Sequence, residues 1–222
     1  MADIPYEFKA SAYSSHTLTL ACFPSDGRGA RVLDVGCGNG YLSALLAERG
    51  FDVTGVERAG GYDERFPKSV KLVEADLERG LPELDGEFDY ILCADILEHL
   101  RRPEDLLAQS RGRLTRGGAM VASLPNSGNL YFRLNVLAGR FPQEDKGLFD
   151  RTHVRFYMWA GWRKLFGDAG FEFERTLVTG IPVGLVMGES LPVRVAERLC
   201  YDLARLWKTL FAYQFVVVTR CK

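Results

Sequence analysis

The sequence predicts an α/β protein with a mostly parallel sheet covered by helices on both faces. Short apolar segments alternate with amphipathic ones along most of the 222 residues, which is the rhythm of βαβ units. The segment 88–94 is apolar almost throughout, as in a strand buried on both faces. Glycine is enriched, with 23 residues against a usual share of about 7%, and three of these glycines lie between the first predicted strand and the first helix.

Seven segments have the length and apolar character of strands. They are 31–35, 52–57, 70–75, 88–94, 119–124, 171–178 and 214–220.

Helices are predicted between them, over 41–49, from Pro103 onward, over 158–169 and over 192–211. Gly50 ends the first of these helices. Pro103 is a favoured first helical residue. The stretch 126–156 is polar, aromatic and irregular, and is expected to be a functional loop.

The chain is predicted to form one domain over 1–222. Within it we expect an N-terminal lid over 1–29 and a ligand-binding core over 30–124. A substrate loop over 125–157 and an apolar, helical insertion over 179–212 complete the prediction.

Composition excludes several classes of protein. The balance of 28 basic and 29 acidic residues disfavours nucleic acid as a partner, because such binders usually carry a basic surplus. Five scattered cysteines without C-x-x-C spacing favour a reducing, cytoplasmic setting over a zinc or disulfide framework. No segment resembles a signal peptide, and the apolar run 176–188 is too short for stable membrane insertion.

The segment Asp34-Val35-Gly36-Cys37-Gly38-Asn39-Gly40 is the most informative motif. Its spacing is G-x-G-x-G, followed by the bulky Tyr41, whereas dinucleotide sites usually show G-x-G-x-x-G. Glu57 and Asp76 end the second and third strands and are suited to accept hydrogen bonds from ribose and adenine. The pattern therefore favours a nucleoside-containing ligand without a pyrophosphate, and argues against a nicotinamide-dependent oxidoreductase.

Together these motifs resemble the class I S-adenosylmethionine-dependent methyltransferases. VLDVGCGNG, GVE, EADLE and FDYILCADILEHL are similar to four successive motifs of that family, over about 30–124. The resemblance implies a Rossmann-like, seven-stranded sheet with an antiparallel last strand at 214–220. It also implies S-adenosylmethionine as the cofactor and methyl transfer by in-line attack.

The resemblance assigns ten residues to the cofactor. Glu57 would hold the ribose hydroxyls, Asp34 would lie near the amino group, and Asp76 with the backbone of Leu77 would meet the adenine. The full set is Asp34, Gly36, Cys37, Gly38, Gly40, Glu57, Asp76, Leu77, Ala94 and Asp95.

Asp95, Glu98 and His99 would share one face if helical. They resemble the E-x-x-E-H metal cluster of some ubiquinone-pathway O-methyltransferases, with Asp95 in place of the first glutamate. Because E-H is also widespread in methyltransferases that use no metal, no metal is predicted here.

The segments SLPNSGNLYFRLNVLAGRF and LFDRTHVRFY resemble MetW-like proteins and related small bacterial methyltransferases. The resemblance places these loops beside the methyl donor. The predicted catalytic residues are His153, a base by its ordinary pKa of about 6.5, and His99. The predicted substrate contacts are Asn126, Tyr131, Arg133, Arg155 and Tyr157. An alternative is that His153 and Arg155 pair with Asp150 and only hold the loop.

The N-terminal segment and the predicted helix 192–211 each allow two interpretations. Tyr13 and His16 would belong to a lid over the cofactor, although a lone histidine more often packs or lies at the surface. Helix 192–211 has an apolar face and a mildly basic one. Packing on the domain or in a homodimer is favoured over a membrane surface.

The sequence thus predicts a methyltransferase with a small-molecule acceptor. Oxygen is the acceptor atom we favour, while nitrogen and carbon stay open. The alternative is a non-catalytic, partner-regulating MetW-like protein that binds S-adenosylmethionine.

Overall fold

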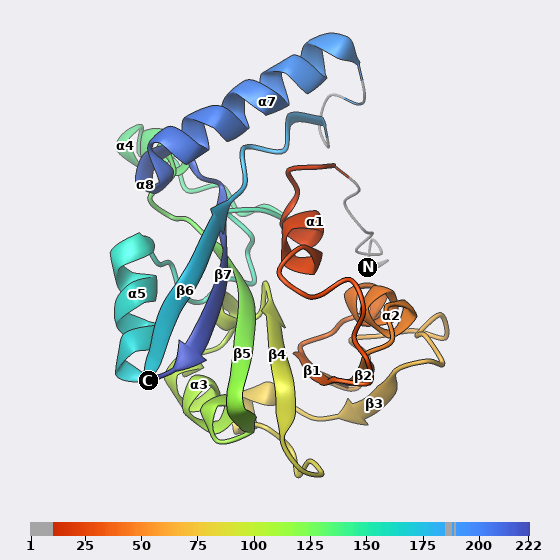
Figure 1. The fold of residues 1–222 in the computed structure, drawn as a ribbon. Coiled ribbons are helices and arrows are strands. Elements are labelled where there is room, and N and C mark those ends of the chain that lie inside the picture. Colours follow the sequence, from red (N-terminus) through yellow and green to blue (C-terminus); the bar gives the residue numbers. More distant parts are fainter. Residues whose placement is uncertain (1–10, 185–187, 189) are drawn as a thin grey trace.

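A seven-stranded sheet in the order β3-β2-β1-β4-β5-β7-β6 forms the centre of the molecule (Figure 1). The computed structural model describes residues 11–184, 188 and 190–222. The strands are β1 Arg31–Val35, β2 Asp52–Glu57, β3 Lys71–Glu74, β4 Phe88–Ala94, β5 Leu114–Pro125, β6 Phe171–Val178 and β7 Gln214–Cys221. β7 runs antiparallel to β5 and β6, and the other pairs are parallel. The predicted mostly parallel sheet with an antiparallel last strand is confirmed.

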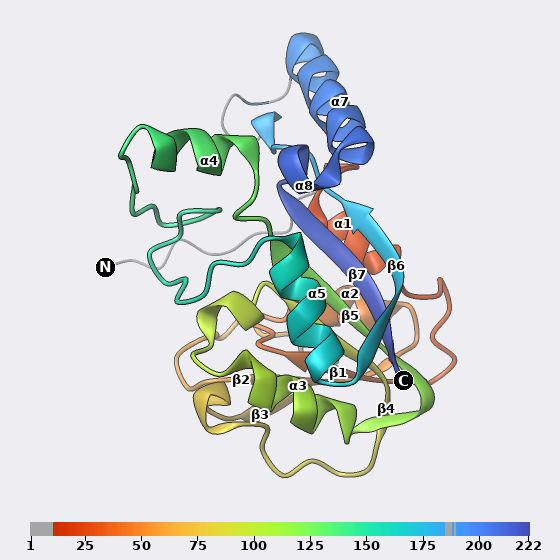
Figure 2. The same ribbon diagram turned by 90° about the vertical axis from the view of Figure 1, so that its left-hand side faces the viewer.

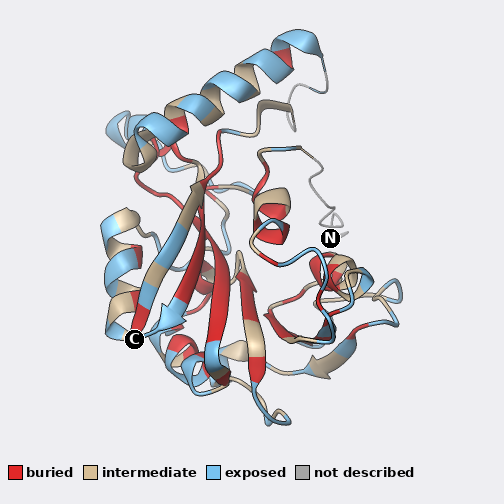
Figure 3. Ribbon diagram, in the orientation of Figure 1, coloured by how far each residue is buried: buried red, intermediate tan, exposed pale blue. Residues whose placement is uncertain are grey.

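Alternating side chains of the central strands feed two cores, one on each face of the sheet. Val32 packs into the core that contains Leu42 and Leu46 of the first helical layer. Its neighbour Leu33 points to the opposite core, which includes Leu106 and Trp162. This alternation follows from the two-residue period of a strand. Figure 3 shows the central strands as the most continuously buried part of the molecule.

Helices cover both faces, as Figure 2 shows most clearly. Their bounds are α1 Ser15–Leu20, α2 Tyr41–Glu48, α3 Pro103–Arg111, α4 Leu130–Leu137, α5 Trp159–Asp168, α7 Leu191–Leu206 and α8 Lys208–Phe211. Two short 3-10 helices, η1 Leu77–Arg79 and η2 Leu97–His99, follow β3 and β4.

Three predicted elements differ in the structure. The loop expected to be irregular contains α4, whose first turn is capped by the Asn129 side chain accepting from the Tyr131 N–H. β5 begins at Leu114, five residues earlier than predicted, because Gly117 and Gly118 lie in an irregular part of the strand rather than in a turn before it.

The third difference is the helix predicted over 192–211. It is interrupted at Trp207, whose φ of −138° and ψ of 77° end α7 before α8 begins. The last turn thus changes direction before the chain enters β7.

The strand arrangement brings the predicted ligand loop to the edge where parallel strands end. Ligands of open α/β sheets bind at this edge, near the crossover between strands β1 and β4. α4, α7 and α8 rise beyond the same edge (Figures 1 and 2). Of the helices in the described ranges, none combines the length and the apolar character needed to span a bilayer.

Candidate active site

The glycine loop joins β1 to α2 and takes a conformation that suits glycine. Gly36, Gly38 and Gly40 have φ values of 77°, 52° and 69°, a left-handed region that other residues rarely adopt. The loop is anchored to the next strand, because the N–H groups of Gly36 and Cys37 both donate to the Val56 carbonyl, at 2.8 and 3.2 Å. A Cβ on Gly38 would meet no heavy atom within 4 Å, so its backbone faces open space and a ligand can approach it closely.

Replacing Gly36 by alanine is expected to lower the free energy of unfolding by about 2 kcal/mol or more. Left-handed backbone costs alanine about 1–2 kcal/mol, and the new Cβ would lie only 2.7 Å from the Ile96 side chain. Gly60→Ala is the matched control, since Gly60 has the same φ of 77° but no neighbour within 4 Å. Urea unfolding measures the free energy of unfolding of both variants. An equal loss in Gly36→Ala and Gly60→Ala would contradict the steric contribution of Ile96.

Two acidic residues border this loop. Asp34 is buried and accepts a hydrogen bond of 2.6 Å from the Ser43 hydroxyl. Its burial raises the pKa of the carboxyl to about 7 against the lowering effect of Ser43, and the charge of Glu57 adds to the rise. Glu57, at the end of β2, accepts the N–H of Gly38 at 2.9 Å. Asp34 is thus held against Ser43 of α2, whereas Glu57 contacts the glycine loop directly.

The third strand ends beside the second. The Ala75 N–H donates to the Glu57 carbonyl at 2.9 Å, which places Asp76 and Leu77 one step farther along the edge. The exposed Asp76 carboxylate caps η1 by accepting the Glu78 N–H. Its partners leave it at the surface, beside Glu57, where an adenine could lie.

The end of β4 supplies Ala94 and Asp95. Asp95 has a φ of 52°, uncommon for a residue with a side chain and tolerated best by Asp and Asn. Its Oδ1 accepts hydrogen bonds from the Ser123 hydroxyl at 2.5 Å and from the Gln214 amide at 2.7 Å. Such strained backbone held by neighbours often marks a functional site.

The helical face expected for Asp95, Glu98 and His99 is not formed, although the charge of Asp95 still acts on Glu98. Residues 97–99 form a 3-10 helix and Asp95 lies before it with left-handed backbone, so the three side chains do not share one α-helical face. The Asp95 carboxylate faces β5 and β7 instead.

Glu98 and His99 instead form a cluster with His153, beside η2. One potential ligand atom each from Glu98, His99 and His153 lie within 4.8 Å of one another. Glu98 is buried, and its Oε2 has no hydrogen-bond partner among the described residues. Carboxylate and imidazole groups in this arrangement could hold a divalent cation. The sequence-based prediction of no metal stays a prediction.

Burial controls the protonation of this cluster. It raises the pKa of Glu98 well above the ordinary value and lowers that of His153 to about 4, with His99 lowering it further. Near neutral pH, His153 is therefore neutral. Its Nε2 lies 3.8 Å from Glu98 Oε1, and the uncharged imidazole has a lone pair that can accept a proton.

The loop that carries His153 is fastened to η2. The N–H groups of Val154 and Arg155 both donate to the Glu98 carbonyl at 3.0 Å. His99 Nδ1 lies 3.0 Å from the Thr152 hydroxyl, and the Arg155 guanidinium donates to the Arg101 carbonyl. The alternative pairing with Asp150 stays a prediction: the His153 N–H donates to the Asp150 carbonyl at 3.0 Å, and the charge of Asp150 raises the pKa of His153 against the lowering effect of burial.

The other predicted substrate contacts are not gathered at one point. Asn126 is fully buried, and its amide binds the Ala212 carbonyl at 2.8 Å and the Gly128 N–H at 2.9 Å. The Tyr157 ring packs on Trp162, with centroids 4.4 Å apart. These contacts favour a structural role for both residues.

Tyr131 and Arg133 lie on α4 and are exposed. The Tyr131 hydroxyl donates to Glu144 at 3.4 Å, and the Arg133 side chain donates to the Gly128 carbonyl at 2.7 Å. A substrate contact at any of the five predicted positions stays a prediction.

The N-terminal segment packs over the glycine loop. His16 of α1 is buried, and its Nε2 lies 3.3 Å from the Tyr41 hydroxyl. Tyr13 stacks on Tyr201 of α7 at 4.4 Å. A cavity of about 40 Å³, bordered by this segment and Gln214, has room for little more than water. The domain divisions, including the lid over 1–29, stay predictions; residues 1–10 lie outside the described ones.

Sequence reasoning missed the side chains that orient the site. Ser43 binds Asp34, Gln214 binds Asp95 and Thr152 binds His99. Gln214 opens a strand more than a hundred residues from its partner, so no local signal could have identified it.

The comparisons with known proteins agree with this geometry. A family model described as a methyltransferase domain matches residues 8–176, about three quarters of the chain. The chain belongs to the methyltransferase-domain family. The predicted class I methyltransferase family and its cofactor, S-adenosylmethionine, are thereby confirmed at the level of the family.

Relatives of this chain are named ubiquinone biosynthesis O-methyltransferase. One from Psychrobacter arcticus is 30% identical over 156 residues, which are 64% of this chain and 59% of the relative. One from Chromobacterium violaceum is 32% identical over 127 residues, 51% of this chain and 52% of the relative. The chain thus spans about half to two thirds of the length of the curated relatives it matches.

Solved structures share the fold of this chain. A Thermotoga maritima protein described as an S-adenosylmethionine-dependent methyltransferase and possible histamine N-methyltransferase has a TM-score of 0.63 at 19% identity, covering 95% of this chain and 89% of its own. A Mesorhizobium loti S-adenosylmethionine-dependent methyltransferase gives 0.62 at 17% identity, with 93% and 98% covered. These likenesses confirm the Rossmann-like fold.

Proposed function

We propose that this chain transfers the methyl group of S-adenosylmethionine to a hydroxyl oxygen of a small molecule. One observation carries the proposal. The glycine loop 36–40, called the cradle below, and the neutral, buried imidazole of His153 lie along the same edge of the sheet. The names of the relatives support oxygen as the acceptor atom. The alternative of a non-catalytic binding protein has the same cradle but no need for the imidazole.

The residues of the cradle fit the cofactor. Gly38 presents open backbone, because a Cβ there would have no neighbour within 4 Å. Glu57 accepts a backbone N–H through Oε2, and a carboxylate has enough lone pairs to accept two ribose hydroxyls as well. The buried Asp34 supplies a partner for a protonated amino group. When bound, the cofactor supplies an activated methyl group on a sulfonium.

The chain's own residues then orient the acceptor and receive its proton. Positioning is the main requirement, because transfer needs in-line approach of the acceptor oxygen. His153 is neutral near pH 7 and we propose that it takes the hydroxyl proton. The His99 ring contacts that imidazole at 4.7 Å, and Glu98 Oε1 lies 3.8 Å from its Nε2.

Cofactor binding is expected to be about tenfold tighter at pH 8 than at pH 6. With a pKa of about 7, Asp34 is mostly protonated at the lower pH and must lose a proton before it can pair with an ammonium group. Titration calorimetry with S-adenosylhomocysteine at both values measures the ratio. Asp34→Asn should bind more weakly and without this pH dependence. If the variant kept the tenfold ratio of affinities between pH 8 and pH 6, a group other than Asp34 would be the one that titrates.

Turnover is tested with paired acceptors. Phenols and catechols should yield S-adenosylhomocysteine, and their methyl ethers, which lack the reacting hydroxyl, should not. If S-adenosylhomocysteine formed only at the background rate with both members of every pair, O-methylation would be contradicted.

A further inference from the structure

The exposed apolar side chains of this protein gather at one end of the molecule. Of fifteen large apolar side chains that are exposed in the described ranges, eleven lie on α4, α7 or the residues that follow them. Leu137 and Leu206 are each 83% exposed. The eleven are Leu130, Tyr131, Leu134, Val136, Leu137, Phe141, Leu191, Val195, Leu199, Leu206 and Trp207. Single exposed apolar residues are normal, but a contiguous group marks an interaction surface.

α7 carries an apolar stripe beside a row of arginines. Leu191, Val195, Leu199 and Leu206 fall within one narrow sector at 100° per residue, and all four are exposed. Arg194, Arg198 and Arg205 each directly precede a member of that stripe, so they line one flank of it. Asp202 lies within the stripe but pairs with Arg198 at 2.9 Å, which offsets its charge.

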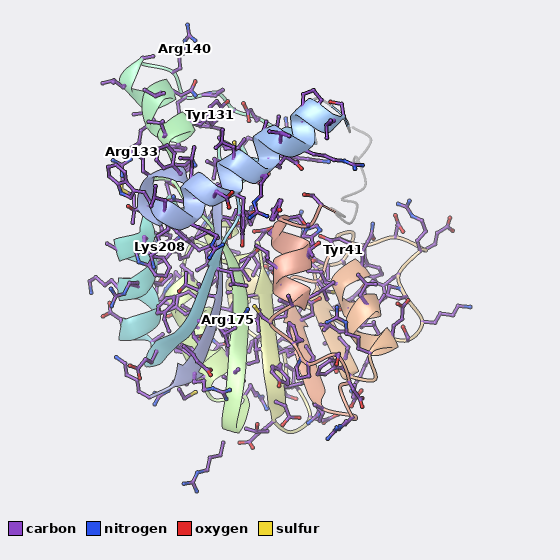
Figure 4. The ribbon with its side chains drawn as sticks, turned by 45° about the horizontal axis from the view of Figure 1, so that its top comes forward. Tyr41, Tyr131, Arg133, Arg140, Arg175 and Lys208 are labelled. Carbon is purple, nitrogen blue, oxygen red and sulfur yellow. The ribbon has the colours of Figure 1, made fainter. Side chains whose placement is uncertain are left out.

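α4 repeats this combination. Its exposed leucines at 134 and 137 lead on to Phe141. The segment 130–141 contains Arg133 and Arg140 and no acidic residue. Segment 191–208 has four basic residues against two acidic ones. Figure 4 shows Arg133, Arg140 and Lys208 at this end of the molecule. The surface is therefore basic in a chain whose net charge is −1.

We propose that this surface, residues 130–141 with 191–208 and named here the α4–α7 end, docks on an anionic phospholipid bilayer. Amphipathic helices with leucines on one side and arginines beside them lie in the headgroup region, where the leucines leave water and the arginines meet lipid phosphates. A helix of 16 residues provides about 24 Å of such contact. The docking is peripheral, with the sheet outside the lipid.

Charge disfavours a second copy of the chain as the occupant. A twofold contact would set the same surface against itself. It would thus oppose two basic faces, and facing like charges destabilise an interface. An anionic bilayer presents the opposite sign to the α4–α7 end.

Docking in this way would bring the bilayer to the proposed acceptor site. The exposed Phe141 ring packs on Phe156 at 5.3 Å, and Phe156 lies 6.1 Å from His153. A line of aromatic rings therefore connects the α4–α7 end with the imidazole. The docking itself goes beyond the proposed function and does not depend on methyl transfer.

The test is flotation of the full chain with vesicles of phosphatidylglycerol and phosphatidylcholine in equal parts. We expect the protein to float with these vesicles at low salt and to be released at high salt, and to stay unbound with phosphatidylcholine alone. Arg140→Glu with Arg205→Glu should lower the partition constant by about 25-fold or more, because each arginine near the surface contributes about fivefold. Leu199→Gln with Leu206→Gln should lower it as well.

Matched controls separate docking from general charge and from misfolding. Arg28→Glu with Arg116→Glu changes the same charge on exposed residues away from the α4–α7 end and should leave flotation intact. Affinity for S-adenosylhomocysteine should be equal in all variants, which shows that they are folded. The proposal is overturned if the protein does not float with anionic vesicles. It is also overturned if the Arg140→Glu, Arg205→Glu variant floats as well as the Arg28→Glu, Arg116→Glu variant. A dimer in light scattering that Leu199→Gln with Leu206→Gln dissociates overturns it as well.

Discussion

Replacing His153 by alanine is expected to lower turnover by about 100-fold, the low end of the usual contribution of a positioned general base, because a pKa of about 4 makes the imidazole a weak base. The imidazole lies 3.8 Å from Glu98 and contacts the His99 ring edge-on at 4.7 Å, and burial with the neighbouring His99 lowers its pKa to about 4. It is therefore uncharged, with a free lone pair, at any pH above that value. Initial rates of S-adenosylhomocysteine formation at saturating acceptor measure the loss.

The pH profile distinguishes a base from a residue that only holds the loop. The wild-type rate should be nearly independent of pH from about 5 to 8, since His153 is neutral throughout. The His153→Ala rate should rise about tenfold per pH unit, because the acceptor must then ionise in solution. A uniformly reduced but flat profile, or a rate that is unchanged, would remove His153 from the chemistry. Affinity for S-adenosylhomocysteine should stay equal to wild type.

Replacing Glu57 by alanine is expected to weaken binding of S-adenosylhomocysteine by about 100-fold or more. Two hydrogen bonds from ribose hydroxyls to a carboxylate would be lost, at about 1.5–3 kcal/mol each. Glu57→Gln keeps one acceptor oxygen and should lose about tenfold. Titration calorimetry measures both variants against wild type.

Asp52→Asn is the matched control for Glu57. Asp52 begins the strand that Glu57 ends, so the change removes a carboxylate from the opposite edge of the sheet and should not alter affinity. Thermal unfolding without ligand guards against loss of fold, because Glu57 also accepts the N–H of Gly38. Wild-type affinity in Glu57→Ala would show that the ribose is held by another group.

Much of the fold was predictable because burial imposes a pattern on the central strands. The predicted ranges 52–57, 88–94 and 171–178 coincide with β2, β4 and β6. α4 was missed for the opposite reason: Leu134 and Leu137 are exposed, so the segment lacks the buried stripe by which a helix is identified. The break at Trp207 interrupts a helical pattern that continues through it in sequence.

The candidate site divides in the same way. The glycine loop and Glu57 are local to strand ends, and sequence spacing alone brings them together. The Glu98–His99–His153 cluster depends on a loop that begins some fifty residues later and is fastened by backbone bonds to the Glu98 carbonyl. Asp95 does not share a helical face with Glu98 and His99, because its φ of 52° lies outside the helical region and spacing along a helix assumes regular backbone.

Transfer of an isotopically labelled methyl group from S-adenosylmethionine to an acceptor hydroxyl is the most direct measurement of the proposed function. Label should appear in the acceptor in equal amount to the S-adenosylhomocysteine formed, and His153→Ala should nearly abolish it. Tight binding of S-adenosylhomocysteine with no label transferred to any phenol or catechol would contradict O-methylation and favour the non-catalytic alternative.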